Sequence, residues 1–161
     1  MIYLGIDNGI AGGLAAYNSE TNEVQTITMP IVRGEKGRNE YDIPKIIEWF
    51  NNLGDIRMVI LEKAQPYPGI GATAVFTNGR NYGIMEGILV ARKLSYMVIH
   101  PKTWQKKMFE GMAYDDTKKA SITTAKRLFP GASFVAKGSS IDHHGMTDAA
   151  LMAYHGYLLH K

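Results

Sequence analysis

Two short apolar runs in this sequence each end in a carboxylate, and this pattern limits the possible folds more than any other feature. Residues 2–6 lead into Asp7, and residues 58–61 lead into Glu62. Such runs, bounded by turn or polar residues, predict buried β-strands. A carboxylate at the end of a buried strand is costly to desolvate unless a cation compensates it. The sequence therefore predicts neighbouring strands that bring Asp7 and Glu62 together around a cation.

A second pair of candidate ligands opens the last helical pattern. His144 and Asp148 stand four residues apart, so they share one helix face. Oxygen ligands hold magnesium well, and two such ions can clamp a phosphodiester for in-line cleavage. Together with Asp7 and Glu62, this pair predicts one metal site and a metal-dependent nuclease.

Each of these residues also has an ordinary structural interpretation. Asp7 could close a turn, and Glu62 could reach water or pair with Lys63. His144 could be structural or solvated, and the nearby Asp142 could cap the last helix. The Asp-x-Gly sequence at residues 7–9 also opens the sugar-kinase and actin-like ATPases. Those proteins need a second lobe, for which a domain of 161 residues has no room.

Length and composition predict a single intracellular domain. We expect one domain over residues 1–161, and the absence of cysteine permits a reducing compartment. No apolar run reaches the roughly 18 residues that a membrane span needs. A strand that begins within two residues of the amino terminus leaves no room for a signal peptide. We therefore expect a soluble protein without membrane contact, in the cytoplasm of a bacterial or phage-infected cell or in an organelle.

The charges are unevenly distributed along the chain. Residues 1–62 hold five basic and nine acidic side chains, whereas residues 92–137 hold ten basic and three acidic ones. A basic segment beside an acidic, metal-ready cluster suits a polyanion that is both held and cut. The ordinary alternative is a solvated helix face.

The order of predicted elements points to one α/β architecture. We expect strands at residues 2–7, 14–17, 24–29, 57–62 and 96–99, and helices after Asp42 and at residues 74–93, 103–109, 115–129 and 144 onward. A glycine- and proline-rich mobile loop should occupy residues 63–74. Three consecutive strands predict an antiparallel meander, and the later alternation predicts parallel strands with helical crossovers. This is an RNase H-like mixed five-stranded sheet flanked by helices.

Several motifs, in this order, resemble one known family. Asp7, Glu62, His144 and Asp148 follow one another as in the RuvC-type Holliday-junction resolvases, particularly their phage and chloroplast branch. Further similar segments are residues 76–87, the Pro-x-x-Trp motif at 101–105, the lysine-led helix at 118–121 and 125–130, and the final helix at 144–151. One departure is His144, where this branch usually has aspartate and some bacterial members have histidine.

The resemblance implies a homodimer that binds a four-way DNA junction and nicks two opposed strands, as in DNA recombination and repair. Each subunit would hold one or two Mg²⁺ ions, or Mn²⁺, on Asp7, Glu62, His144 and Asp148. Cleavage would leave a 5′ phosphate and a 3′ hydroxyl. Lys118 matches the catalytic lysine of the family, although Lys119 adjoins it.

Other residues become candidate DNA contacts under the same resemblance. The basic ones, predicted to hold backbone phosphates, are Arg80, Lys102, Lys106, Lys107, Lys119, Lys126 and Arg127. Phe76 and Tyr82 could stack on a base at the crossover, or could belong to the core. The stripe Met85, Ile88, Leu89 and Arg92 could be core or dimer surface. A loop that adapts to DNA is also expected from the composition around Pro66, Pro68, Gly69 and Gly71.

Two other functions remain open from the sequence. A related nuclease that acts on other branched DNA or on RNA would share every catalytic residue. A non-catalytic junction-binding module is disfavoured by the intact Asp7, Glu62 and Asp148.

Overall fold

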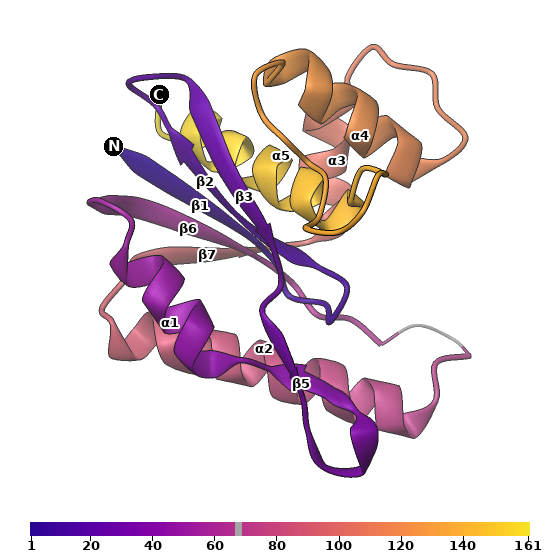
Figure 1. Cartoon of the computed structure of the whole chain (residues 1–161). Helices are drawn as coiled ribbons and strands as arrows, with labels where there is room; N and C mark the ends of the chain where they lie inside the picture. Colours follow the sequence, from indigo (N-terminus) through magenta and orange to yellow (C-terminus); the bar gives the residue numbers. More distant parts are fainter. Residues whose placement is uncertain (67–68) are drawn as a thin grey trace.

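A mixed sheet of five strands forms the centre of the protein, in the order β3-β2-β1-β6-β7 (Figure 1). The computed structural model describes residues 1–66 and 69–161. The strands are β1 (Ile2–Asp7), β2 (Gly13–Asn18), β3 (Glu23–Thr28), β6 (Ile56–Glu62) and β7 (Tyr96–Ile99). β1, β2 and β3 pair antiparallel, whereas β1–β6 and β6–β7 pair parallel. The predicted meander and parallel crossovers are both confirmed.

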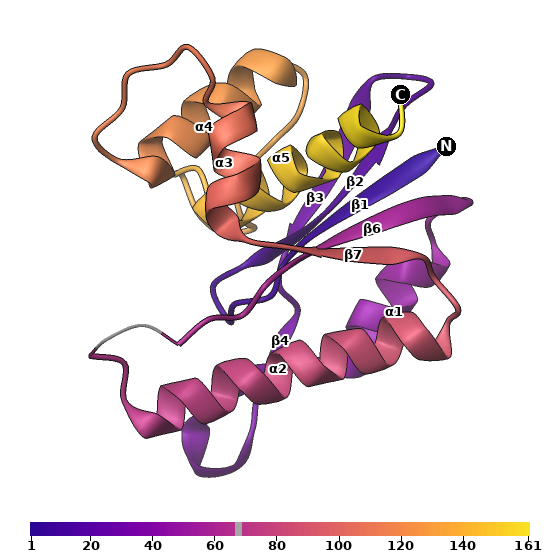
Figure 2. The same cartoon turned by 180° about the vertical axis from the view of Figure 1, so that it is seen from behind.

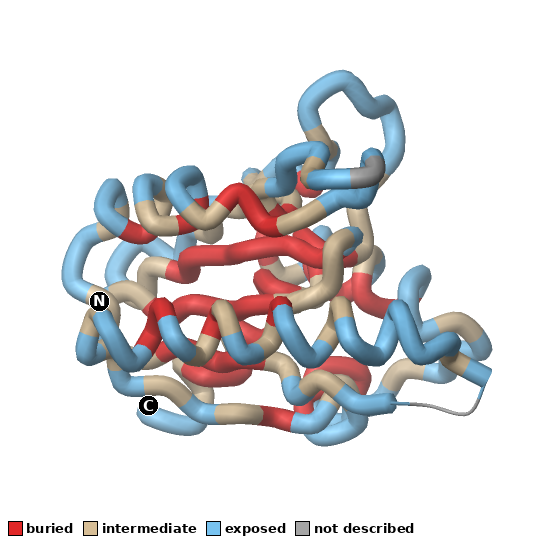
Figure 3. The backbone as a smooth tube through the Cα atoms, turned by 90° about the horizontal axis from the view of Figure 1, so that it is seen from below, coloured by how far each residue is buried: buried red, intermediate tan, exposed pale blue. Residues whose placement is uncertain are grey.

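Helices cover both faces of this sheet (Figures 1 and 2). One face carries α1 (Ile43–Asn51) and α2 (Ala72–Ala91); the other carries α3 (Pro101–Met108), α4 (Thr117–Leu128) and α5 (His144–Leu159). Alternate residues of each strand therefore enter two different cores: Leu4 and Ile6 pack toward α1 and α2, and Tyr3 packs toward α5. The buried positions follow the strands and the inward sides of the helices (Figure 3).

Helix α5 packs closer to the sheet than the other helices do. A Cβ atom at Gly5 on β1 would lie 1.9 Å from the carbonyl oxygen of Ala149 and 2.6 Å from the backbone nitrogen of Ala153. Only glycine allows β1 and α5 to approach this closely. The alanine-rich inner side of α5, with Ala149, Ala150 and Ala153 fully buried, completes the contact.

A small hairpin was absent from the elements that the sequence predicted. It consists of β4 (Ile31–Arg33), the 3-10 turn η1 (Glu35–Gly37) and β5 (Asn39–Tyr41), and it forms a second sheet of two strands. Its strands are too short to produce a recognisable alternation, and Ile31 and Val32 are exposed. Tyr41 anchors the hairpin, because its ring is buried and its hydroxyl donates a hydrogen bond to the carbonyl of Asn8.

Some helix ends differ from the sequence-based bounds for local reasons. Asp42 caps α1 as predicted, accepting the N–H of Lys45. Helix α4 begins at Thr117 rather than at residue 115, because the side chain of Asp116 is its N-cap. The alternative interpretation of Asp142 as the cap of α5 is wrong: the N-cap position is His143, and Asp142 forms an ion pair with Lys126 at 2.6 Å.

The segment between β6 and α2 is only partly described. Pro66, Gly69 and Gly71 lie in backbone without regular structure, α2 begins at Ala72, and Pro68 lies outside the described residues.

Within α2, Met85, Ile88 and Leu89 are buried, so this stripe belongs to the core. No described helix is long and apolar enough to cross a membrane.

Candidate metal centre

Strand pairing places Asp7 and Glu62 side by side at one end of the sheet. In the parallel pair β1–β6, Ile6 lies opposite Leu61, so Asp7 and Glu62 are the next residues on adjacent strands. Strand alternation puts Asp7 on the same face as Tyr3 and Gly5, which is the face that α5 covers. The same alternation places Glu62 with Ile60 on that face.

The amino terminus of α5 reaches the same end of the sheet. A Cβ atom at Gly145 would lie 2.6 Å from the Cα atom of Gly12, in the turn that follows β1. One at Gly12 would in turn lie 2.9 Å from Cγ of Asp7. Two glycines thus bring the first turn of α5, with His144 and Asp148, against the end of β1. The four predicted ligands are gathered in one region by β1, β6 and α5.

The three carboxylates form one electrostatic group. Burial raises the pKa of Asp7 to about 6, although the hydrogen bond from the N–H of Gly9 lowers it. Burial, followed by the charges of Asp7 and Asp148, raises the pKa of Glu62 to about 8. Burial and the charge of Asp7 raise the pKa of Asp148 to about 7, although Ser121 and Lys118 lower it. The charge of Asp7 thus raises the pKa of both Glu62 and Asp148, because like charges disfavour the ionised form.

The surroundings of His144 favour its neutral form. Burial lowers its pKa, and the charges of Lys118 and His143 lower it further. Its Nδ1 atom has no hydrogen-bond partner among the described residues. A neutral imidazole with a free ring nitrogen is the form that binds a metal ion. Lys118, exposed in the first turn of α4, acts on both His144 and Asp148.

The donor set fits a hard divalent cation, because three carboxylates and one imidazole supply oxygen and nitrogen ligands to a region with surplus negative charge. Within residues 1–66 and 69–161, no three such side chains already enclose a single point closely enough to hold an ion. Side-chain rotation would therefore have to complete the coordination shell.

Two groups that sequence reasoning did not assign to the site hold Glu62. Trp104, fully buried on α3, donates its Nε1–H to Glu62 Oε1 at 2.9 Å. The side chain of Asn8 donates to the carbonyl of Glu62 at 3.1 Å, and Asn8 is in turn bound by Tyr41. Trp104 could have been found from the sequence, because it is the tryptophan of the Pro-x-x-Trp motif. Nothing in the sequence indicated Tyr41. Its contact with Asn8 joins residues 33 positions apart, and Tyr41 belongs to a hairpin that was not predicted.

The predicted DNA contacts divide between the two faces of the sheet. On the α5 side, Lys102 and Lys106 of α3 and Lys118 and Lys119 of α4 are exposed, and Lys118 acts on Asp148. Lys107 pairs with Glu110 at 2.9 Å, Lys126 pairs with Asp142, and Arg127 is exposed.

The remaining predicted contacts lie on α2, across the sheet from α5. Arg80 pairs with Glu40 of the hairpin at 3.2 Å. Phe76 is 73% exposed, as a stacking residue requires. Tyr82 packs partly against the core, and its hydroxyl donates to Glu86 at 3.2 Å. Of the two aromatic candidates, only Phe76 has a largely free ring.

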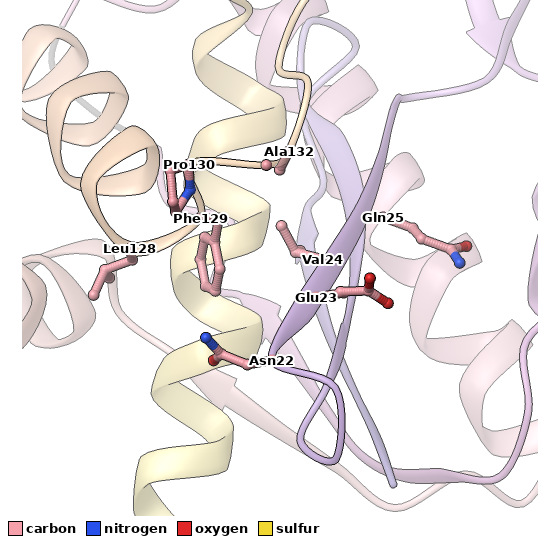
Figure 4. A pocket seen from close by; sticks show the side chains of 9 residues that line it. Asn22, Glu23, Val24, Gln25, Leu128, Phe129, Pro130 and Ala132 are labelled. Atoms are coloured by element: carbon pink, nitrogen blue, oxygen red, sulfur yellow. The ribbon is translucent and has the colours of Figure 1, made fainter.

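A hollow of about 380 Å³ lies at the opposite end of the sheet (Figure 4). It is formed by the start of β3, including Glu23 and Gln25, and by the segment that ends α4, including Phe129 and Pro130. None of the predicted site residues lines it. We therefore do not assign it to the metal centre.

Comparison with solved structures identifies a shared fold. Thermus thermophilus RuvC in complex with a Holliday junction substrate matches 99% of this chain and 96% of its own, with a TM-score of 0.58 and 12% identity. A second Thermus thermophilus RuvC structure matches 98% and 96%, with a TM-score of 0.51 and 13% identity. No protein-family model and no curated protein matches the sequence. The chain thus has the predicted RNase H-like fold in its RuvC form, while the phage and chloroplast branch stays a prediction.

Proposed function

We propose that this chain is a metal-dependent endonuclease that nicks branched DNA, with the four-way junction as its substrate. The observation that carries the proposal is the group formed by Asp7, Glu62 and Asp148. These carboxylates come from β1, β6 and α5, and each is partly buried with a raised pKa. Ionising such a group opposes folding, because burial raises the pKa of each carboxyl. Clusters of perturbed carboxylates are typical of functional sites.

Mg²⁺ or Mn²⁺, one or two ions per subunit, would occupy this group. Bound ions would supply Lewis-acid activation of a water molecule and charge stabilisation of the leaving oxygen. Asp7, Glu62 and Asp148 would provide the oxygen ligands, and His144 a neutral nitrogen. The substitution of imidazole for a fourth carboxylate leaves one negative charge fewer in the cluster, which reduces repulsion toward a phosphodiester.

The other residues of the site have roles that follow from their positions. Lys118 brings a positive charge to the open side of the cluster, where it can stabilise a phosphate that gains charge during cleavage. Trp104 orients one oxygen of Glu62 and leaves its other oxygen for a ligand role. Lys102, Lys106 and Lys119 would hold backbone phosphates and contribute affinity without sequence information.

The fold supports DNA as the substrate. The similar RuvC structure was solved with a Holliday junction substrate. Symmetric nicks in two opposed strands need two active sites, and each chain supplies one. We therefore propose a homodimer as the active form.

The test is cleavage of a synthetic four-way DNA junction in Mg²⁺, beside duplex, forked and RNA–DNA hybrid substrates. We expect paired nicks in the junction, and loss of activity in Asp7→Asn, which keeps the shape of the side chain but removes its charge. Cutting that ignores the junction would favour the second candidate, a related RNase H-like nuclease for other branched DNA or RNA. Absence of metal-dependent cutting on every substrate would refute the nuclease proposal.

A further inference from the structure

A hollow of about 410 Å³ is lined by α3, by the start of α4 and by the connection between the two helices. Its lining residues are Lys102, Gln105, Lys106, Phe109, Tyr114 and Thr117. Lys102 and Lys106 are predicted from the sequence to bind phosphate, and the other four residues have no predicted function. Helices α3 and α4 lie on the same side of the sheet as α5 (Figure 2).

The hollow combines an aromatic wall with free positive charge. The ring of Tyr114 is 46% exposed and packs edge-on against buried Phe109, with ring centres 5.1 Å apart and planes at 73°. This contact holds the Tyr114 ring in place while leaving part of it open. Lys102 and Lys106 are exposed at the rim, and neither forms an ion pair with a described residue.

Two short connections link the hollow to the metal centre. Phe109 packs edge-on against Trp104, with ring centres 5.8 Å apart, and Trp104 donates its hydrogen bond to Glu62. On the other side, Thr117 immediately precedes Lys118, whose charge acts on His144 and Asp148. Each wall of the hollow is therefore one residue removed from a side chain that acts on a candidate ligand.

We propose that this hollow binds one unpaired nucleotide of the cleaved strand, next to the scissile phosphate. The base would stack on Tyr114, the flanking phosphates would contact Lys102 and Lys106, and Gln105 would offer hydrogen bonds to the base edge. An aromatic ring can stack on any base whose face is free, and the lysines can bind any nucleic-acid phosphate. This site would therefore favour unpaired nucleotides without preferring a particular sequence. The identity of the ligand rests on the proposed nuclease function.

The first experiment measures the affinity of the full chain for a short fluorescent single-stranded DNA, in EDTA so that nothing is cut. Tyr114→Leu removes the ring but keeps an apolar side chain against Phe109, and we expect it to weaken binding roughly fivefold or more. Tyr114→Phe keeps the ring and should retain the affinity of the unmodified chain. Lys106→Gln should reduce the dependence of log affinity on log salt by roughly 0.7.

Val90→Ala is the matched control, because it removes exposed apolar surface from a side chain of α2, across the sheet, that has no proposed DNA contact. Crosslinking with an oligonucleotide that carries 5-iodouracil then locates the base, and we expect the crosslinked peptide to contain Tyr114. Unchanged affinity of a folded Tyr114→Leu variant, or crosslinks to Phe76 instead of Tyr114, would overturn the inference. Circular dichroism of both variants checks that they remain folded.

Failure of this inference is separable from failure of the proposed function. A chain that cuts junctions normally after Tyr114→Leu would keep its nuclease function and lose this nucleotide site. A chain that binds single strands through Tyr114 but cuts no substrate would keep the site and lose the nuclease proposal.

Discussion

The three carboxylates of the candidate metal centre accept hydrogen bonds from different donors. Asp7 accepts a backbone N–H from Gly9, Glu62 accepts the indole N–H of Trp104, and the pKa of Asp148 is lowered by a hydrogen bond from Ser121. Each interaction favours the ionised form, but burial outweighs it in all three cases. Each carboxylate thus has its own hydrogen-bond donor, while burial opposes its ionisation.

Lys118 and Lys119 can be separated by experiment, because they face different groups. Both lysines act on the N-cap residue Asp116, but only the charge of Lys118 also acts on His144 and Asp148. We expect Lys118→Ala to reduce the cleavage rate by roughly 100-fold, the size of effect seen when one charge stabiliser is removed. Lys119→Ala should change the rate little. Equal losses in both variants, measured in single-turnover assays, would mean that the two lysines act only through general DNA affinity.

Trp104 can be tested as the residue that positions Glu62. Trp104→Phe removes the N–H donor while retaining an aromatic ring, and we expect Mn²⁺ affinity to fall by roughly 10-fold, as for other residues that orient metal ligands. Calorimetric titration measures this affinity. Trp49→Phe is the matched control, because Trp49 packs with the core on the α1 side of the sheet. An unchanged affinity in folded Trp104→Phe would show that the bond to Glu62 has no role in metal binding.

At the scale of elements, the close contact between α5 and the β1–β2 turn determines where His144 and Asp148 lie. Gly145→Ala would place a methyl group 2.6 Å from the Cα atom of Gly12. We expect it to destabilise the fold by roughly 1–3 kcal/mol, the cost of overpacking, and to weaken metal binding, because it displaces the first turn of α5. Chemical denaturation and metal titration measure the two effects.

Gly83→Ala provides the control for this substitution. Gly83 lies within α2 and has no atom within 4 Å of an added Cβ. The alanine should stabilise the helix by roughly 0.5–1 kcal/mol and leave metal affinity unchanged. If the two variants had the same stability and affinity, the proposed role of the Gly12–Gly145 contact would be wrong.

The elements that the sequence predicted well are those with a strong local pattern. The bounds of β1 and β7 agree with the predicted ranges, and Asp7 and Glu62 follow from simple strand endings. The sequence also placed His144 and Asp148 at the start of the last helix. The hairpin β4–β5 and the Tyr41–Asn8 contact were not predictable, because they depend on long-range packing rather than on local alternation. The α3–α4 hollow likewise requires knowledge of how two helices meet.

At the scale of the whole molecule, the raised pKa values link stability to pH. The ordinary values are 3.8 for aspartate and 4.5 for glutamate, and the folded values are about 6, 8 and 7 for Asp7, Glu62 and Asp148. At pH values between the ordinary and the folded pKa values, the native state binds more protons than the unfolded state. Stability therefore falls as pH rises through this range. We expect the thermal midpoint of the metal-free protein to decrease from about pH 5 to about pH 8.

Divalent metal should reverse this trend, because it binds the ionised carboxylates and competes with protons. The stabilisation by Mg²⁺ should be larger at pH 8 than at pH 5, as measured by thermal unfolding with and without the ion. Asp148→Asn removes one of the titrating groups and should flatten the pH dependence. Stabilisation by Mg²⁺ that is greater at pH 5 would contradict the assignment of these carboxylates as ligands.

The central claim, that side chains from β1, β6 and α5 form one divalent-metal site, is tested most directly by anomalous diffraction from crystals grown with Mn²⁺. We expect a manganese peak within coordination distance of Asp7 and Glu62, with Asp148 or His144 completing its ligand shell, and no such peak in Asp7→Asn crystals. A well-ordered structure in saturating Mn²⁺ with no peak among these side chains, or with the ion bound elsewhere, would contradict the claim.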